Sequence, residues 1–296
     1  MQSNNQPLVS VPVVTYNSAK TIVETLDSIY NQTYPNIELI VSDDCSKDNT
    51  VEIVREWLDS HKSRFVRTEL ITIPENRGVS ANYNRAASAC HGEWIKDFDG
   101  DDIMLPHCIQ TYMDYVSSHP ETIYVFSKIE VFGGDETRRK KMIEYGKYDF
   151  FTWSPKEQYD YLTLKANCIY SMGSFYNRQA MIDRNIVYDE RIPLIEDWSR
   201  WIILLQKGVK LDFIDEVLSL YRMSENSLST QTTPSVAFQK SYFLTYKYYR
   251  FKNDYKHGDK KTVIMKYLRG ERLLHDNNIV WRLICKVYRI CVLHQW

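Results

Sequence analysis

The sequence predicts an α/β fold with a mostly parallel mixed sheet flanked by helices, followed by a C-terminal helical extension. Two observations carry this prediction. Over the first hundred residues, short apolar runs alternate with amphipathic helical patterns, and strands separated by helices of that length pair in parallel through right-handed crossovers. Near the end of the chain, residues 279–296 combine apolar and basic side chains at helical spacing.

Each element in the first hundred residues has a signal of its own. Short runs of mainly apolar residues predict strands over 8–14, 37–41, 70–73 and 94–98. Between these runs, apolar residues recur at the three- and four-residue spacing of a helix face. The predicted helices carry Ile22, Leu26 and Ile29, then Val51, Val54, Trp57 and Leu58, and then the run 79–90.

The second half of the chain has a less regular pattern. Two further strands are expected at 124–127 and 211–214. The stretch 133–157 opens with GGDETRRKK and is expected to be a mobile insertion, whereas the polar stretch 223–235 is expected to be a loop before the C-terminal helices. Open α/β sheets bind ligands beyond the carboxyl ends of their strands, so residues that follow predicted strands are the site candidates.

Composition places the chain among soluble globular proteins. It has 296 residues, of which 44% are hydrophobic and 25% charged, enough for a sizeable core. The formal net charge of −1 argues against a nucleic-acid partner. Six cysteines without metal-binding or Cys-x-x-Cys spacing predict free thiols in a reducing compartment. Neither a signal peptide nor a run of about 18 apolar residues is seen, so a cytoplasmic protein is expected.

The strongest chemical signal is the run Asp99-Gly100-Asp101-Asp102, which directly follows a predicted strand. Carboxylates packed together repel one another unless a cation sits among them. Mg²⁺ and Mn²⁺ accept carboxylate oxygens and complete their shells with phosphate oxygens, so the run indicates a divalent metal site. The alternative is an acidic turn in which Asp101 or Asp102 caps the next helix, and an isolated run of this kind fits that alternative more often.

A second acidic pair, Asp43-Asp44, also follows a predicted strand. A carboxylate at that place can accept a hydrogen bond from the imide N–H of a pyrimidine, which would select uracil. Taken alone, such a pair is more often a helix cap. Two acidic clusters at the ends of neighbouring parallel strands favour a shared ligand site.

Two further stretches carry side chains of chemical interest. Glu196-Asp197-Trp198 opens an amphipathic run, and Asp197 there is either a helix cap or a general base that takes a proton from an attacking hydroxyl. Arg222 precedes the polar loop and is either a surface cation or a partner for a departing diphosphate.

In order and spacing, these stretches resemble the family 2 glycosyltransferases. The resemblance is carried by VSVPVVTYNSAKTIVETLDSIYNQTYPNIELIVSDDCSKDNT, by ENRGVSANYNRAASACHGEWIKDFDGDD, by IEDW and by YRMSENSLS. It spans roughly residues 8 to 230 and is most specific over the first hundred. The resemblance implies the GT-A fold, a nucleotide-sugar donor, a metal ion and inversion at the anomeric carbon.

The resemblance also implies roles for residues of the nucleotide-binding part. Val14 and Tyr16 would lie against the nucleotide. Asp44, with its neighbour Asp43, would read the base. Arg77, in the Asn-x-Gly turn, would approach the base or the ribose.

The remaining motifs carry over in the same way. Asp99 and Asp101 match the D-x-D motif, with Asp99 near the ribose and metal and Asp101 as the metal ligand proper. Asp102 would line the donor-sugar pocket. Further along the chain, the resemblance implies that Asp197 is the catalytic base, with the acid Glu196 beside it. Trp198 would stack on a sugar, and Arg222 would contact the diphosphate.

Two departures from the family pattern are present. Pro12 comes earlier in the first strand than the proline of the family, and Ser224 stands where many members have histidine, which puts one diphosphate contact in doubt. The implied mechanism has Asp197 deprotonate the acceptor hydroxyl, while Mn²⁺ or Mg²⁺ and Arg222 neutralise the leaving diphosphate. An α-linked UDP-sugar would then give a β-linked product.

The acceptor is expected by analogy with bacterial members that extend O-antigen or capsule repeats. It would be a lipid-linked sugar such as GlcNAc-diphosphoundecaprenol, or an oligosaccharide, with UDP-glucose or UDP-galactose as the favoured donor. In residues 279–296, Arg282, Lys286 and Arg289 recur among apolar residues. This pattern fits a helix on an anionic membrane and equally a last helix packed on the domain. A peripheral protein on the cytoplasmic face of the bacterial inner membrane is expected.

The expected domains are a transferase domain, 1–230, and a C-terminal helical region, 231–296, which is a candidate for membrane association. Within the first, 8–105 would bind the nucleotide and 106–230 the acceptor. Two other classes stay open on the residues alone. A metal-dependent nucleotidyltransferase or pyrophosphatase is disfavoured because a glycine-rich phosphate loop is missing from the sequence. A non-catalytic sugar-nucleotide-binding protein is disfavoured by the apparent base, Asp197.

Overall fold

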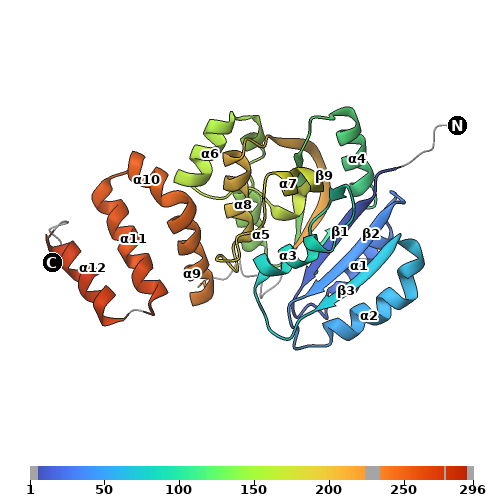
Figure 1. Cartoon of the computed structure of the whole chain (residues 1–296), viewed down its shortest axis with the longest axis horizontal. Coiled ribbons are helices and arrows are strands. Elements are labelled where there is room, and N and C mark those ends of the chain that lie inside the picture. The colour runs from blue at the N-terminus through green and yellow to red at the C-terminus, as the bar shows by residue number, and fades with distance from the viewer. Residues whose placement is uncertain (1–5, 224–233, 277, 292–296) are drawn as a thin grey trace.

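The computed structural model describes residues 6–223, 234–276 and 278–291. Ser224, most of the expected loop 223–235, and the last five residues of the stretch 279–296 therefore lie outside the described residues. Figure 1 shows an α/β body that contains the sheet, with the helices α9–α12 gathered at the opposite end of the molecule.

Over the described residues the sheet has nine strands in the order β3-β2-β1-β4-β8-β7-β9-β6, with β5 also beside β1. Strands β1, β2 and β3 pair in parallel, as do β1 with β4 and β5, whereas β8 runs antiparallel to β4 and β7. This confirms the expected mixed sheet. The strands are β1 Val9–Thr15, β2 Ile37–Asp43, β3 Arg67–Thr72, β4 Trp94–Ile95, β5 Phe98–Asp99, β6 Ile103–Met104, β7 Tyr124–Gly133, β8 Ser174–Asn177 and β9 Leu211–Met223.

The helices of the body pack on both faces of this sheet, because successive strand residues point to opposite faces. Val9, Val11 and Val13 join a core cluster with α1, α2 and α4, whereas Ile40 joins a second cluster with α6 and α8. The helices of the body are α1 Ile22–Tyr30, α2 Thr50–His61, α3 Val79–Ser88, α4 Cys108–Ser118, α5 Glu136–Tyr145, α6 Pro155–Leu164, α7 Arg178–Asp183 and α8 Glu196–Gln206.

Several elements differ from the sequence prediction. The strand expected over 94–98 is split into β4 and β5, and β7 and β9 are much longer than expected. They pair in parallel along their length, with a register shift at Lys128. The stretch 133–157, expected to be a mobile insertion, contains α5 and a 3-10 helix, Tyr148–Thr152. Helix α5 is polar on nearly all sides, so hydrophobic periodicity gave no signal for it.

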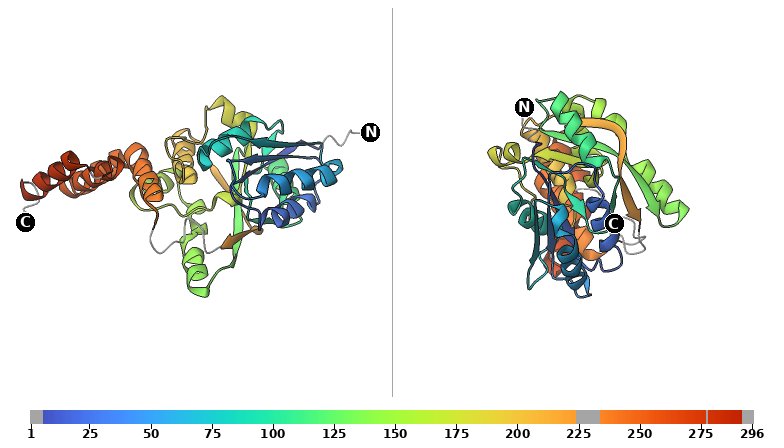
Figure 2. Two further views of the ribbon diagram at one scale, coloured as in Figure 1. Left: turned by 90° about the horizontal axis from the view of Figure 1, so that it is seen from below. Right: turned by 90° about the vertical axis from the view of Figure 1, so that its right-hand side faces the viewer.

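The C-terminal helices are α9 Val236–Thr245, α10 Phe251–His257, α11 Lys260–Leu274 and α12 Ile279–Cys291, with a π-helical turn at Tyr246–Arg250. The left view of Figure 2 shows them extending from the body as an arm. Its base is held by Arg250, which donates to the carbonyls of Thr163 and Lys165 at 2.9 and 2.8 Å. In the described part of the chain, each helix is too short or too polar to cross a membrane.

Candidate active site

The acidic runs Asp43-Asp44 and Asp99-Gly100-Asp101-Asp102 meet at the carboxyl end of β1. In the register of the sheet, Thr15 lies beside Asp43 and Val14 lies beside Asp99. The backbone N–H of Asp44 donates to the Thr15 carbonyl at 3.0 Å. The acids that follow β2 and β5 therefore flank one strand end, where an α/β sheet binds its ligands.

Helix α3 links the two acidic runs through two of its side chains, Tyr83 and Arg85. The Tyr83 hydroxyl donates to Oδ1 of Asp99 at 2.7 Å. Arg85, two residues on, donates from Nη2 to Oδ1 of Asp44 at 3.1 Å and from Nε to the Ser42 hydroxyl at 2.9 Å. Because both acids are held from the same helix, their separation is fixed by α3.

The turn that precedes α3 also holds the segment that leads into α8. The backbone N–H groups of Arg77 and Gly78 donate to Oδ2 of Asp44 at 3.0 and 2.8 Å. Gly78 has φ +86°, and a Cβ there would lie 2.8 Å from Cβ of Pro193, so the position requires glycine. The N–H of Val79 donates to the Pro193 carbonyl at 2.9 Å. Since α8 begins three residues later, its first turn is brought to the same side.

The acidic run after β5 carries carboxyls whose pKa values are all raised. Burial, followed by the charge of Asp101, raises the pKa of Asp99 to about 7. Burial also raises the pKa of Asp101, and it raises the pKa of Asp102 well above its usual range. The run does not cap the next helix, because α4 begins only at Cys108. The alternative of a capping turn is therefore wrong for these residues.

Arg222, at the end of β9, places its cation against this run. Its Nε donates to the Asp101 carbonyl at 2.6 Å, and its guanidinium pairs with Glu24 and lies 4.6 Å from the ring centre of Phe132. The charge of Arg222 acts against burial and lowers the pKa of Asp101. The prediction that Arg222 reaches the metal and diphosphate side of the site is thus consistent with its position.

The first turn of α8 contributes the second half of the site. Burial raises the pKa of Asp197 to about 6. Its Oδ2 accepts from Nδ2 of Asn167 at 2.7 Å, and its Oδ1 accepts from the N–H of Trp198 at 2.6 Å. The pKa of Glu196 is raised well above its usual range by burial, then by Asp197 and then by Asp99. The contribution of Asp99 shows that the acids of α8 and β5 form one electrostatic group.

Several side chains that were expected to contact ligands are buried and contact other groups of the protein instead. Asp102 is fully buried, and its Oδ1 accepts from the N–H of Arg222 at 2.8 Å, so it does not line an open donor pocket. Trp198 is 4% exposed and donates to the Leu162 carbonyl at 2.9 Å. The expectation that it stacks on a sugar is therefore wrong, because its ring is packed inside the protein.

The residues expected to bind the nucleotide differ in their access to solvent. Val14 is buried in a cluster with Tyr83, and Asp43 is buried with both carboxylate oxygens bonded to Ser46. Neither side chain is free to contact a nucleotide in this structure. Tyr16, in contrast, is 47% exposed, so it remains available to a base or ribose. Asp44 is buried, but its Oδ1 accepts only from Arg85 among the described residues.

The sequence analysis missed a buried polar network beneath the acids. The Asp97 carboxylate accepts from the hydroxyls of Tyr176 and Tyr188 at 3.0 and 2.6 Å. Tyr188 stacks on Tyr83 at 4.9 Å, and the guanidinium of Arg200 lies 4.0 Å from the Tyr188 ring centre. The network therefore runs from α3 to α8. The signal for it in the sequence is the charged pair Lys96-Asp97 inside the predicted strand 94–98.

A cation fits the chemistry of the site through two carboxylates. Asp99 and Asp101 supply the hard oxygen donors that Mg²⁺ and Mn²⁺ accept. Buried Oδ2 of Asp102 has no hydrogen-bond partner among the described residues, which adds to the negative charge left uncompensated there. Within the described ranges, three Cys, His, Asp or Glu side chains do not converge as a complete metal cage, so phosphate oxygens would have to complete the shell.

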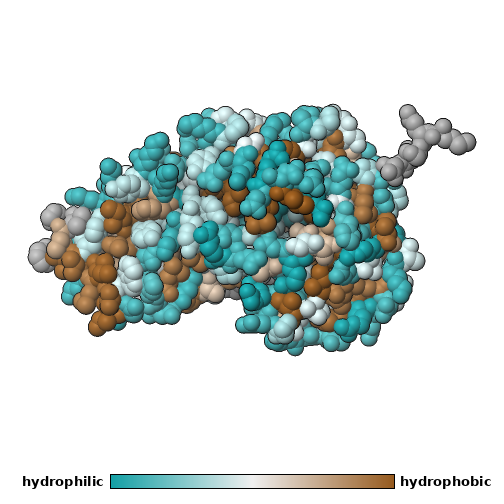
Figure 3. Space-filling view, viewed as in Figure 1, coloured by the Kyte–Doolittle hydropathy of each residue, from teal (hydrophilic) through white to brown (hydrophobic). Residues whose placement is uncertain are grey.

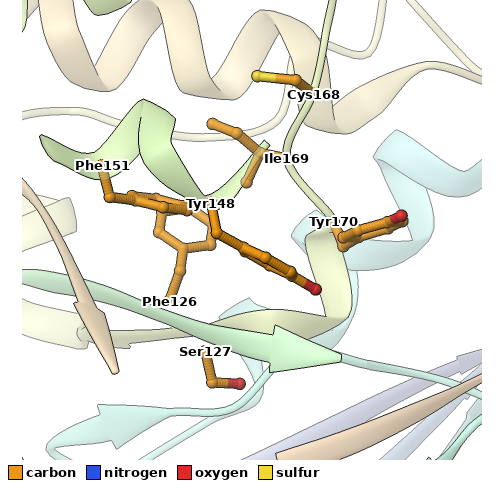
Figure 4. A pocket seen from close by; sticks show the side chains of 7 residues that line it. All are labelled: Phe126, Ser127, Tyr148, Phe151, Cys168, Ile169 and Tyr170. Carbon is orange, nitrogen blue, oxygen red and sulfur yellow. The ribbon is translucent and has the colours of Figure 1, made fainter. Parts of the chain in front are cut away.

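A recess lies elsewhere in the second half of the body. It has about 190 Å³ of empty space, open solvent included, between β7, the 3-10 helix Tyr148–Thr152 and residues 168–170. Figure 4 shows that aromatic rings dominate its walls. None of the residues that line the recess is an acid, so the recess is distinct from the site of the carboxylates. The lining residues are Phe126, Ser127, Tyr148, Phe151, Cys168, Ile169 and Tyr170.

Comparisons with known proteins agree with this arrangement. The Escherichia coli protein WfaP, named UDP-Glc:alpha-D-GlcNAc-diphosphoundecaprenol beta-1,3-glucosyltransferase, is 27% identical over 226 residues, which are 75% of this chain and 80% of WfaP. Staphylococcus aureus TarS 1–349 in complex with UDP-GlcNAc has a TM-score of 0.65 at 16% identity, over 98% of this chain and 93% of that chain. The Pyrobaculum calidifontis mannosyltransferase PcManGT, in complex with GDP-Man and Mn²⁺, has a TM-score of 0.59 at 18% identity, over 98% of this chain and 76% of that chain. The two solved structures show a shared fold, the GT-A arrangement expected from the sequence.

The sequence signature described as Glycosyl transferase family 2 matches residues 10–185. That stretch is more than half of the chain and contains β1, both acidic runs of the nucleotide-binding part and α3. This chain belongs to glycosyl transferase family 2 and is a glycosyltransferase.

Proposed function

We propose that this enzyme transfers a hexose from UDP-glucose or UDP-galactose to a lipid-linked sugar such as GlcNAc-diphosphoundecaprenol, giving a β-linked product. The observation that carries the proposal is the gathering of three acidic segments at one strand end, held there by α3 and its preceding turn. The printed activity of WfaP supports this donor and acceptor, and the UDP-GlcNAc bound to TarS supports a uridine nucleotide. The pathway would be bacterial O-antigen or polysaccharide synthesis.

The donor would bind across the carboxyl ends of β1, β2 and β5. Asp44 would accept from the uracil imide, with Tyr16 and Arg77 beside the base and ribose. Asp99 and Asp101 would hold Mn²⁺ or Mg²⁺, which supplies positive charge to the leaving diphosphate. We assign Val14, Asp43 and Asp102 to supporting positions, because the structure buries their side chains.

The acceptor hydroxyl would be activated by Asp197. A carboxyl with a pKa of about 6 is mostly ionised at neutral pH and is a stronger base than an ordinary aspartate. The hydrogen bond from Asn167 fixes its orientation. The hydroxyl would attack C1 from the face opposite the diphosphate, which inverts the anomeric centre. Arg222 would stabilise the charge that develops on the leaving group, and Glu196 would stay protonated beside the base.

The division of the chain follows from these roles. Residues 1–230 would form the transferase domain, with 8–105 for the nucleotide and 106–230 for the acceptor, and residues 231–296 would form a helical region. An acceptor on a lipid diphosphate lies at a membrane surface, so the enzyme would work as a peripheral protein on the cytoplasmic face of a bacterial inner membrane.

The test is a donor panel with synthetic GlcNAc-diphosphate-lipid as acceptor, with and without Mn²⁺, reading out nucleotide release and product mass. UDP-glucose or UDP-galactose should give UDP and a glycolipid larger by one hexose, and only with metal. Reaction of free oligosaccharides without reaction of the lipid-linked sugar would overturn the acceptor. Release of pyrophosphate or UMP in place of UDP would point to a nucleotidyltransferase or pyrophosphatase.

A further inference from the structure

The C-terminal helical region differs in charge from the rest of the chain. Residues 231–296 contain thirteen Lys and Arg but only four Asp and Glu, whereas the whole chain has 37 and 38. The near-neutral chain therefore consists of an anionic body and a strongly cationic arm. A charge asymmetry of this kind indicates an anionic partner for the cationic part.

One side of α12 packs against the rest of the arm. Trp281 stacks on His275 with ring centres 5.3 Å apart, and the Tyr288 hydroxyl donates to the Lys261 carbonyl at 3.2 Å. Cys285, on the same side, is 3% exposed. This side holds α12 on α11, as in the packed alternative of the sequence analysis.

A second side of α12 is apolar and open to solvent. At 3.6 residues per turn, its exposed apolar residues fall on one continuous stripe. Figure 3 shows hydrophobic surface at the end of the arm where α12 lies. A stripe of this kind on a soluble protein marks an interaction surface. Its members are Ile279, Val280, Leu283, Ile284 and Val287.

A third side of α12 is basic and borders the apolar stripe. Arg282, Lys286 and Arg289 are all exposed and recur at helical spacing. Among the described residues, none of the three forms an ion pair. Their positive charge is therefore available to a partner that also covers the apolar stripe.

The acids of the arm do not neutralise this basic side, because each is already engaged elsewhere. Asp254 pairs with Lys266 at 3.2 Å and Glu271 pairs with Lys247 at 2.6 Å. Asp276 pairs with Lys240. The remaining acid, Asp259, caps α11 by accepting from Thr262.

We propose that α12 binds the surface of an anionic lipid bilayer. The stripe from Ile279 to Val287 would enter the boundary between head groups and acyl chains, while Arg282, Lys286 and Arg289 would meet the lipid phosphates. A second copy of this chain fits the stripe less well, because it would bring two cationic arms together. The packed and membrane-bound alternatives of the sequence analysis are compatible, since they use different sides of one helix.

The arm is also attached to the helix that begins at the proposed base. The guanidinium of Arg250 lies 4.3 Å from the ring centre of Trp198, and Tyr242 meets the same ring edge-on at 5.4 Å. Trp198 directly follows Asp197. A bilayer bound to α12 would therefore have a fixed orientation relative to the base, which suits an acceptor carried on a lipid. The role of α12 in presenting a lipid-linked acceptor to Asp197 rests on the proposed function, but binding of α12 to vesicles does not.

The test is co-sedimentation of the full chain with vesicles of phosphatidylcholine containing phosphatidylglycerol, compared with vesicles of phosphatidylcholine alone. The wild type should bind the anionic vesicles and lose binding as salt is raised. The double variant Leu283→Glu/Val287→Glu should not sediment. Reversing Arg282, Lys286 and Arg289 to Glu should weaken binding at least about tenfold, since each basic residue near the surface contributes about 1 kcal/mol.

Matched controls separate the surface from general charge and hydrophobicity. Val66→Glu replaces a valine of the body that is as exposed as Val287, and Lys252→Glu/Lys256→Glu reverses two exposed lysines on α10. Val66→Glu should bind like the wild type, and the α10 variant should keep the larger part of its affinity. All variants should retain turnover of a water-soluble GlcNAc-diphosphate acceptor, which also shows that they fold.

Two results would overturn the proposal. One is equal sedimentation of the wild type with neutral and anionic vesicles, or no sedimentation with either. The other is a wild-type dimer in solution that Leu283→Glu/Val287→Glu converts to a monomer, which would assign the stripe to a second copy. Vesicle binding without any transferase activity would leave this surface in place and remove only the proposed function.

Discussion

Glu38 and the acidic run that begins at Asp99 lie beside opposite ends of β1, and the protein compensates their negative charges to different extents. At the amino ends, Glu38 lies between Ser10 and Arg67 of the neighbouring strands. Burial alone would raise the pKa of Glu38, but hydrogen bonds from Ser10, Arg67 and the N–H groups of His91 and Gly92 lower it below its usual value. At the carboxyl end, the Asp99 carboxylate accepts a single hydrogen bond among the described residues, from Tyr83, and burial raises the pKa of Asp99 to about 7.

The difference separates a structural carboxylate from functional ones. The charge of Glu38 is fully compensated by the protein, including the guanidinium of Arg67 at 3.0 Å. The charges of Asp99, Asp101 and Asp102 oppose one another. A protein keeps such a group at a cost in stability when a cation or substrate supplies the missing charge. The acids at the carboxyl end of β1 are therefore the candidate functional group, on grounds that do not depend on any relative.

The largest effect is expected from Asp197→Asn, which removes the proposed base from the functional end. The amide cannot take a proton from the acceptor, so kcat should fall by about 10² to 10⁴-fold. The KM for the UDP-sugar should change little, because Asp197 is assigned to the acceptor. UDP release under saturating donor measures both. Undiminished turnover in this variant would remove Asp197 from the mechanism.

The next effect is expected from Asp101→Asn, which relieves repulsion at the functional end. Activity should fall by about 10² to 10³-fold, the range for loss of one group that stabilises a leaving charge. Without ligands the variant should be as stable as the wild type or more so, because one of three opposed charges is gone. Thermal unfolding with and without Mn²⁺ and UDP measures this. A variant destabilised in the absence of ligands would show that Asp101 is structural.

Substitution of Glu38, whose charge is compensated, should instead lower the stability of the fold. Glu38→Gln should destabilise the fold by about 3 kcal/mol, since removal of one partner leaves the buried side of Arg67 unpaired. Urea unfolding measures the loss. The matched control is Glu69→Gln, which removes the other, partly exposed partner of Arg67 and should cost at most about 1 kcal/mol. Equal losses of unfolding free energy in the two variants would show that the buried Glu38 contributes no more to stability than the partly exposed Glu69.

The sequence predicted the parts of the fold and site that depend on local pattern. Strands β1 and β2 and helices α1 to α3 follow from apolar spacing, and the acidic runs follow from their place after strands. The role of Glu38 was missed although it is an acid inside an apolar predicted strand, because its four partners come from three other segments of the chain. Tyr83 and Arg85 were missed for the same reason: their role depends on which strand ends α3 faces, and no local pattern records that.

The smallest expected effects are those of pH on the stability of the fold. The contributions of Glu38 and Asp99 should change with pH in opposite directions. Glu38 has a lowered pKa, so the stability it contributes is present above its unfolded pKa and is lost as the pH falls through its folded pKa. Asp99 has a raised pKa, so without metal the fold should gain stability as the pH falls from about 7 towards the unfolded value. Glu38→Gln and Asp99→Asn should each flatten one of these trends in pH-dependent urea unfolding. For catalysis, kcat should decline below about pH 6, where Asp197 takes up a proton.

The account as a whole depends on acids from separate segments sharing one cation and one nucleotide diphosphate. Calorimetric titration of UDP into the wild type and into Asp99→Asn and Asp101→Asn, with and without Mn²⁺, tests this most directly. UDP should bind the wild type markedly more tightly with Mn²⁺, and this gain should be absent in both variants while Glu38→Gln retains it. The same UDP affinity with and without Mn²⁺, or a gain that survives in both aspartate variants, would contradict the account.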